Sequence, residues 1–200
     1  MAQRTDNFSM SAIEQALRSR VSASARPARP AAKTAAVYVL FSGQQDGPVM
    51  TLIRRSESVG QHRGEYAFPG GGVEPYDHTL HDTALREAQE ELGVSASDIE
   101  PWGRLDPEAT VTSGYLVVPF TGRLGLDARL SPAPAEVSEV VWVPLSCLVD
   151  PASERVISRL SAAQSGPQLS NYPAYVIDGR VIWGATARII AQVVTILRAA

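Results

Sequence analysis

Apolar residues in the central part of the chain occur in short runs separated by turn residues. Residues 35–41 (AAVYVLF) and 49–54 are two such runs on either side of a turn at 44–48, which predicts a hairpin of two strands. Asp178-Gly179 predicts a second hairpin, over residues 175–182. Further strands are expected at 65–68, 102–105, 115–124 and 139–145.

Helical spacing of apolar residues and helix start and stop signals mark the remaining elements. The predicted helices are 9–20, 79–93, 152–162 and 185–199. The helix at 79–93 starts with the capping pair Thr79 and Asp82 and stops at Gly93. Strands with helices before, between and after them predict an α/β fold, a mixed sheet with helices on both faces.

The segment SASARPARP at residues 22–30 contains prolines and small polar residues, which predict an extended linker between the first helix and the rest of the chain. We therefore divide the chain into residues 1–33, a helix with its linker, and a domain at 34–200. The first helix is expected either to pack as an outlier or to swap onto a partner subunit, as in a homodimer.

Composition narrows the class of protein. With 44% hydrophobic and 20% charged residues the chain is typical of a soluble globular protein, and a net charge of -3 argues against a general nucleic-acid binder. No apolar run reaches the roughly 18 residues of a membrane span. Residues 1–20 lack the apolar segment of a secretory signal, so a cytoplasmic location is expected. Cys147 lies in an apolar run and is expected in the core.

The chemistry of the chain is concentrated in residues 68–94, where a glycine turn precedes a helix rich in carboxylates. Glu87, Glu90 and Glu91 are spaced i, i+3 and i+4, which places them on one helix face. Such close like charges repel, so a divalent cation between them is the simplest explanation. Carboxylate oxygens favour hard cations over zinc. These residues predict a metal-dependent enzyme that acts on a phosphorylated substrate.

The helix also carries a family motif. REAQEELGV, from Arg86 to Val94, matches R-E-U-x-E-E-x-G-U, the second half of the Nudix box, at every specified position (U is apolar). The first half is one residue longer than the general pattern. Counted forward from Gly71, the acid of the loop is Asp77, whereas counted back from Arg86 that position is His78. We prefer Asp77, because the glycines after Phe68 resemble the family's usual entry to the loop.

Two further stretches resemble the Nudix subgroup that cleaves coenzyme A. One is residues 51–71 and the other is VIWGATAR at 181–188, so the likeness spans about 35–195. In the first stretch the matching positions are Leu52, Arg55, Ser56, Gly64, Phe68, Pro69, Gly70 and Gly71. The positions that differ are Thr51, Ile53, Tyr66 and Gly60. Gly60 replaces an arginine of the signature, and Arg63 is a candidate substitute.

The resemblance implies an α/β/α sandwich with a mixed sheet that hydrolyses a diphosphate with Mg²⁺ or Mn²⁺. It implies Glu87, Glu90, Glu91 and the Gly71 carbonyl as metal ligands, with either Glu87 or Glu91 acting on the water. It gives Arg86 an ion pair that holds a glutamate of the box, and Glu90, at i+4, is one geometric partner. The substrate contacts that it suggests are Arg55, Ser56, His62, Arg63, Gly64 and Gly70; composition alone would make most of them a polar surface loop.

The substrate expected from this likeness is a small nucleotide, coenzyme A or its thioesters, with adenosine 3',5'-bisphosphate and a phosphopantetheine as products. ADP-ribose, NADH or another dinucleotide is the first alternative, which Gly60 keeps open. The second is a non-catalytic nucleotide-binding module, against which the full glutamate set argues. Tyr175 and Trp183 are candidates to stack on a base, although strand aromatics are more often core. Glu136 and Glu139 precede a strand where some Nudix enzymes carry an extra acid, and we assign them no role.

Overall fold

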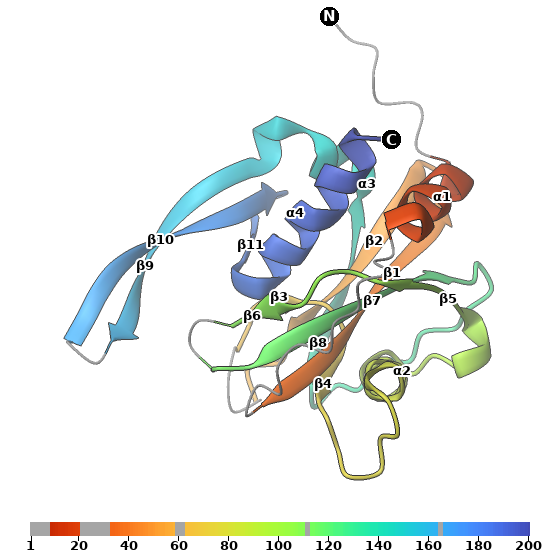
Figure 1. Ribbon diagram of the computed structural model, residues 1–200, viewed down its shortest axis with the longest axis horizontal. Helices are drawn as coiled ribbons and strands as arrows, with labels where there is room; N and C mark the ends of the chain where they lie inside the picture. The colour runs from red at the N-terminus through yellow and green to blue at the C-terminus, as the bar shows by residue number, and fades with distance from the viewer. Residues whose placement is uncertain (1–8, 21–32, 59–62, 111–112, 164–165) are drawn as a thin grey trace, which may run out of the picture.

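A mixed sheet between two layers of helices forms the centre of the computed structural model, which describes residues 9–20, 33–58, 63–110, 113–163 and 166–200 (Figure 1). The predicted hairpin is confirmed: β1 (Thr34–Gln44) pairs antiparallel with β2 (Gly47–Arg55). On its other side β1 pairs in parallel with β7 (Leu116–Leu124). The sheet is therefore mixed, as expected.

The remaining strands of this sheet are short or lie at its edges. They are β3 (Tyr66–Ala67), β4 (Gly70–Gly72), β5 (Ile99–Arg104), β6 (Glu108–Ala109) and β8 (Val137–Pro144). Among the described residues the strand order is β3-β2-β1-β7-β5, with β4 on β1, β6 on β7 and β8 on β2. The glycine strand β4 thus lies against the central strand of the sheet.

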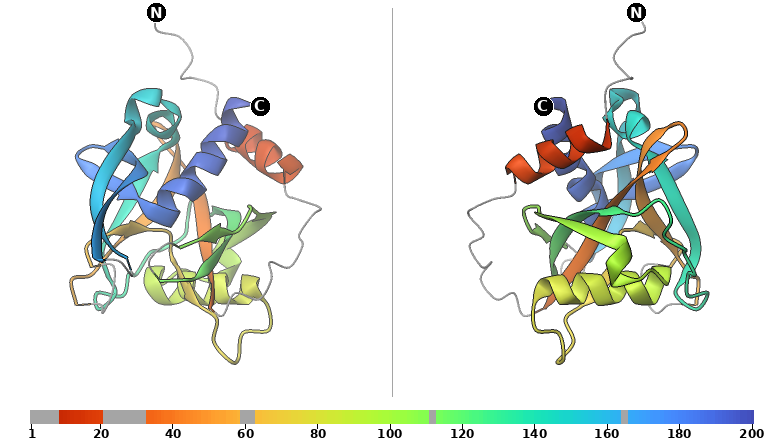
Figure 2. Two further views of the ribbon diagram at one scale, coloured as in Figure 1. Left: turned by 60° about the vertical axis from the view of Figure 1, so that its left-hand side comes forward. Right: turned by 90° about the vertical axis from the view of Figure 1, so that its right-hand side faces the viewer.

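Helices cover both faces of the sheet because β1 alternates its buried side chains. Ala36, Tyr38 and Leu40 pack in the cluster with α2 (Leu80–Leu92), whereas Val39 and Phe41 pack in the cluster with α4 (Gly184–Arg198). This period of two is that of a strand buried on both faces. The α/β/α sandwich expected from the sequence is confirmed (Figure 2).

The first helix, α1 (Met10–Arg20), is part of this core and not an outlier. Ile13 and Leu17 are fully buried in the same cluster as α4, and Arg18 binds Glu100 of β5 at 3.1 Å. Its apolar face is therefore satisfied within one chain. The predicted linker at residues 22–30 lies outside the described residues.

The predicted helix at 152–162 is wrong. A 3₁₀ turn at Pro151–Ser153 leads into β9 (Glu154–Ala163), which pairs antiparallel with β10 (Gly166–Ile177). The helical periodicity of this segment is weak, and β-branched residues such as Val156 suit the ladder that β10 provides. The predicted turn at Asp178-Gly179 is confirmed and joins β10 to β11 (Arg180–Trp183). Figure 1 shows β9 and β10 extending from the body as a long ribbon.

Helix α2 has the ends that the sequence predicts. The Thr79 hydroxyl accepts a hydrogen bond from the Asp82 backbone N–H at 3.1 Å, and the Asp82 carboxylate accepts one from the Thr79 N–H at 2.8 Å. Gly93 ends the helix with a φ of 69°. A short helix, α3 (Leu145–Val149), carries Cys147, which packs partly buried against the core. In the described part of the chain, no helix is both long and apolar enough to cross a membrane.

Candidate active site

The glycine turn brings the backbone of β4 against the acidic face of α2. Gly70 and Gly71 pair with Val37 and Ala36 of β1. A Cβ on Gly70 would overlap the backbone of Ala36 and Val37, and one on Gly71 would overlap the carboxylate of Glu87. At Gly70, whose φ is 157°, only glycine allows this approach, whereas a side chain at Gly71 would displace the Glu87 carboxylate, so the turn does more than connect two elements.

Glu91 is the most buried acid of the site, with a side chain that is 1% exposed. Its carboxylate accepts a hydrogen bond from the Gly70 N–H at 2.9 Å and lies 3.4 Å from the Arg55 guanidinium. Burial raises the pKa of Glu91 to about 8, although the Gly70 N–H and Arg55 act in the opposite direction. A negative charge at this position is only partly compensated, so a bound cation would favour the charged form of Glu91.

Glu87 lies one helical turn earlier and faces the same glycines. Its side chain is 14% exposed, and burial raises its pKa, against the opposing effect of the Arg86 guanidinium, which binds it at 2.9 Å. The charge of Glu87 contributes in turn to the raised pKa of Glu91. The two carboxylates therefore form one acidic pair, in which Glu91 is fully buried and Glu87 largely so.

Glu90 differs from this pair. Its side chain is 52% exposed and binds Arg86 at 3.0 Å, which is the i+4 ion pair considered above. Across the described residues, no three Asp, Glu, His or Cys side chains converge in the arrangement of a metal site. Arg86 Nη1 donates to both Glu87 and Glu90, so Glu90 lies at the exposed side of the group, whereas Glu87 and Glu91 face the glycine strand. The metal role of Glu90 stays a prediction.

The donor chemistry of the pair fits the expected ion. Both groups offer only oxygen, both are buried with raised pKa values, and both lie beside the backbone of β4. Mg²⁺ and Mn²⁺ prefer such hard oxygen donors. A divalent cation would also remove the electrostatic cost of the buried charges.

Arg86 and Asp77 form a two-pronged ion pair beside the acidic pair. The Arg86 Nε and Nη2 donate to the two Asp77 oxygens at 3.0 and 3.1 Å, and Nη2 also donates to the Gly72 carbonyl at 3.0 Å. The Asp77 side chain is 3% exposed, and its hydrogen bonds to Arg86 hold its pKa well below the usual range. Arg86 therefore ties the loop before α2 to the glycine strand.

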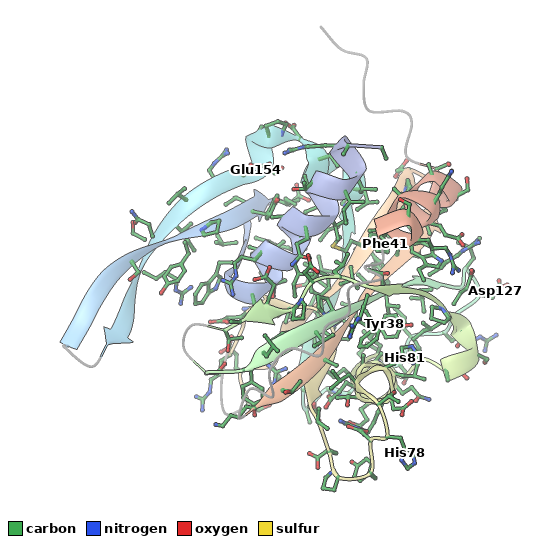
Figure 3. All side chains as sticks on the ribbon, viewed as in Figure 1. Tyr38, Phe41, His78, His81, Asp127 and Glu154 are labelled. Carbon is green, nitrogen blue, oxygen red and sulfur yellow. The ribbon has the colours of Figure 1, made fainter. Side chains whose placement is uncertain are left out.

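The histidines near the start of α2 lie elsewhere. His78 is exposed on the outer side of the helix start, whereas His81 lies between α2 and the sheet, 3.2 Å from the Tyr38 hydroxyl (Figure 3). The His81 ring packs against Tyr38 and Phe120. The position of Asp77, and not that of His78, supports counting the loop forward from Gly71.

A cavity of about 350 Å³ opens beside the same glycine strand. Arg55 and Gly70 line it on the side of the acids. Its aromatic lining is Tyr66, Phe68, Tyr115, Tyr172 and Trp183. Volumes of this order suit a small ligand or one part of a larger one. The arrangement can hold a diphosphate at β4 and an attached group in the cavity.

The predicted substrate residues are not all at this cavity. Arg55 and Gly70 line it, whereas the Ser56 hydroxyl shares a hydrogen bond with Ser58 on the surface at 2.7 Å. Arg63 and Gly64 belong to the described part of the loop after β2, outside the cavity lining. His62 and Gly60 lie outside the described residues.

Sequence reasoning assigned no role to one acid of the site and left out most of its aromatic side chains. The charge of Glu136 contributes to the raised pKa values of Glu87 and Glu91, so this acid belongs to their electrostatic environment. Its place before β8, whose Val137 pairs with Arg55, was the available signal. Of the two aromatic candidates for stacking, Trp183 lines the cavity, whereas Tyr175 is 4% exposed in the core. The other aromatic side chains of the cavity had no local signal in the sequence.

Comparison with known proteins gives matches over most of the chain. Residues 32–161 match the family model of the NUDIX domain. The uncharacterized Nudix hydrolase NudL of Photorhabdus laumondii is 38% identical over 145 residues, covering 72% of this chain and 75% of that protein. NudL of Pectobacterium atrosepticum is 32% identical over 147 residues, covering 72% and 73%. A crystal structure from Deinococcus radiodurans shares the fold, with a TM-score of 0.51 and 17% identity over 86% of this chain and 89% of that one.

Proposed function

This chain belongs to the Nudix family of hydrolases, and from that premise we propose that it cleaves the phosphoanhydride bond of coenzyme A or its thioesters. The products would be adenosine 3',5'-bisphosphate and a phosphopantetheine. Enzymes of this family act on nucleoside diphosphate derivatives and generally use divalent metal ions. The proposal concerns the substrate and the residues that act on it.

One observation carries the proposal: the buried pair Glu87 and Glu91 and the aromatic cavity meet at the same glycine strand, Gly70–Gly72. A diphosphate at this strand would lie within reach of the acidic pair. One of its substituents would then enter the cavity. The geometry therefore suits a diphosphate with a bulky group attached, more than a small inorganic phosphate.

The sequence likeness to the coenzyme A subgroup supports this substrate, because its two separate stretches border one cavity. Arg55, Phe68 and Gly70 come from the first stretch, and Trp183 and Thr186 come from the second. These segments are far apart in the sequence but adjacent in space. A likeness that concerned folding alone would have no reason to gather at a ligand cavity.

Each residue of the candidate site would have its own role in the reaction. Glu87 and Glu91 would hold the metal with the Gly71 carbonyl, and one of the two would orient or deprotonate the attacking water. When bound, the metal neutralises phosphate charge and lowers the pKa of a bound water. Arg86 would keep Glu87 and β4 in place through Asp77 and Gly72. Arg55, which is only 3.4 Å from Glu91, would contact a phosphate.

The test is a substrate panel with the purified protein in Mg²⁺ or Mn²⁺. It compares kcat/KM for coenzyme A, ADP-ribose, NADH and nucleoside triphosphates. We expect the highest value for coenzyme A or an acyl derivative. A preference for ADP-ribose would overturn the coenzyme A assignment, and no turnover of any compound would overturn the proposed reaction.

A further inference from the structure

Three residues of the small sheet form a stacked cluster at the edge of the cavity: Arg159 of β9, Tyr172 of β10 and Trp183 of β11. The Arg159 guanidinium lies 4.0 Å from the centroid of the Trp183 ring. The rings of Tyr172 and Trp183 meet edge to face, with centroids 5.6 Å apart. Tyr172 and Trp183 both line the cavity.

Strand register explains why these residues meet. Arg159 is opposite Ser170 and Trp183 is opposite Ala174, so Tyr172 is two positions from each partner on β10. Diagonal neighbours at this spacing lie on the same face of a sheet and are within reach of long or aromatic side chains. The β9–β10 ribbon therefore brings a positive charge against Trp183, a residue of the cavity lining.

The interaction partners of Arg159 differ from those of the two arginines that line the cavity, Arg55 and Arg188. Arg55 lies 3.4 Å from Glu91, and Arg188 binds Glu108 at 2.9 Å. Within the described residues, Arg159 has no hydrogen bond and no ion pair, only the contact with Trp183. The indole orients the guanidinium without neutralising it, so its charge is available to an anion.

We propose that Arg159 binds the 3'-phosphate of the substrate's adenosine half while Trp183 and Tyr172 hold its adenine ring. This inference rests on the proposed coenzyme A function and adds the orientation of the substrate. Aromatic walls suit a flat base, and a free guanidinium suits a phosphomonoester. The adenosine half of coenzyme A carries both groups, whereas the pantetheine half carries neither. The ribbon is thus a device that selects a 3'-phosphorylated nucleotide.

Coenzyme A and 3'-dephospho-coenzyme A differ only in this phosphate, so their relative kcat/KM values test the assignment. Arg159→Met keeps an unbranched apolar chain over Trp183 and removes the charge. We expect the preference for coenzyme A over the dephospho compound to fall about tenfold, as for the loss of a charge-assisted hydrogen bond. Arg155→Met is the matched control on the same strand, because Arg155 donates to the Ala152 and Glu154 carbonyls. This variant should keep the wild-type preference.

The assignment to Arg159 is overturned if its variant keeps the wild-type preference. It is also overturned if Lys33→Met loses the preference instead, since Lys33 lies 5.6 Å from the Tyr115 ring on the cavity wall. Calorimetry with adenosine 3',5'-bisphosphate and adenosine 5'-phosphate separates this inference from the reaction. Tighter binding of the bisphosphate by wild type, lost in Arg159→Met, would support the subsite even if coenzyme A were not cleaved.

Discussion

The candidate site has an acidic end, between α2 and β4, and an aromatic end, around Trp183. The two ends differ in the charge and the packing of their side chains. At the acidic end Glu87 and Glu91 are buried near each other, with pKa values raised by burial. At the aromatic end neutral rings and one arginine stack without opposing charges. Without a bound cation, the buried carboxylates of the acidic end therefore destabilise the folded protein, whereas the aromatic end has no such buried charge.

This difference suggests a division between reaction and recognition. Groups that must act on charge are kept where charge is unfavourable until a cation and a substrate arrive. Groups that choose the substrate need only a shape and a place for its ring and phosphate. Substitutions at the two ends should therefore affect different measurements.

The largest effect is expected from Glu91→Gln. The amide can still accept the Gly70 N–H but cannot carry charge, so turnover should fall by about a thousandfold or more while the fold is retained. The measurement is kcat with Mg²⁺, with circular dichroism as the check on folding. Glu100→Gln is a matched control, because Glu100 is an exposed acid on β5 that binds Arg18. Full activity in Glu91→Gln would remove Glu91 from the reaction.

The same substitution should stabilise the protein when metal is absent. The pKa of Glu91 is raised from 4.5 to about 8, so the folded state holds its proton more tightly than the unfolded state. That stabilisation is complete below pH 4.5 and is lost as the pH rises towards about 8. With EDTA at pH 8, the free energy of unfolding of Glu91→Gln should therefore exceed that of wild type by about 2–4 kcal/mol. Denaturant titration of the two proteins measures this difference.

Mg²⁺ provides the complementary measurement. A cation that binds only the folded state should raise the Tm of wild type and should raise that of Glu91→Gln much less. Equal metal-dependent shifts would show that Glu91 is not a ligand. A lower stability of Glu91→Gln in EDTA would contradict the cost that we assign to the acidic end.

The two ends also differ in how far the sequence could predict them. The acids, the glycines and Arg86 lie within residues 70–91, where helical spacing and turn chemistry are local, so the sequence indicated their grouping. It did not indicate that Arg86 would bind Asp77, Glu87 and Glu90 at once, because that depends on where the Asp77 carboxylate lies in space. The aromatic end joins residues from Tyr66 to Trp183, which meet only through strand pairing.

The fold too could be predicted only where its features depend on residues close together in the sequence. The hairpins and the ends of α2 followed from turn and cap residues, which act over a few positions. Strand β9 was missed because its conformation depends on a ladder with β10 and not on its own weak periodicity. The burial of α1 was missed because a proline-bearing segment says nothing about where the helix before it will pack.

An intermediate effect is expected from Asp77→Asn. The change weakens the two-pronged ion pair with Arg86, which positions Glu87 and the Gly72 carbonyl. Residues that support metal ligands in this way contribute about 10–100-fold to activity, and we expect a loss of that size in kcat. His78→Asn is the control for the other count of the loop, because His78 is exposed. A loss in the His78 variant with none in Asp77→Asn would reverse our choice of loop acid.

The smallest effect is expected at the aromatic end, from Trp183→Ala. Stacking of a base on an aromatic side chain contributes about 1–3 kcal/mol, so KM for coenzyme A should rise by roughly tenfold. The catalytic rate at saturation should change little, because the substitution leaves the acidic pair and the glycine strand intact. Trp142→Ala on β8 is the matched control, since that indole is 47% exposed and the side chain does not line the cavity. If Trp183→Ala lowered kcat and left KM unchanged, the aromatic end would belong to the reaction itself, and the division between the two ends would fail.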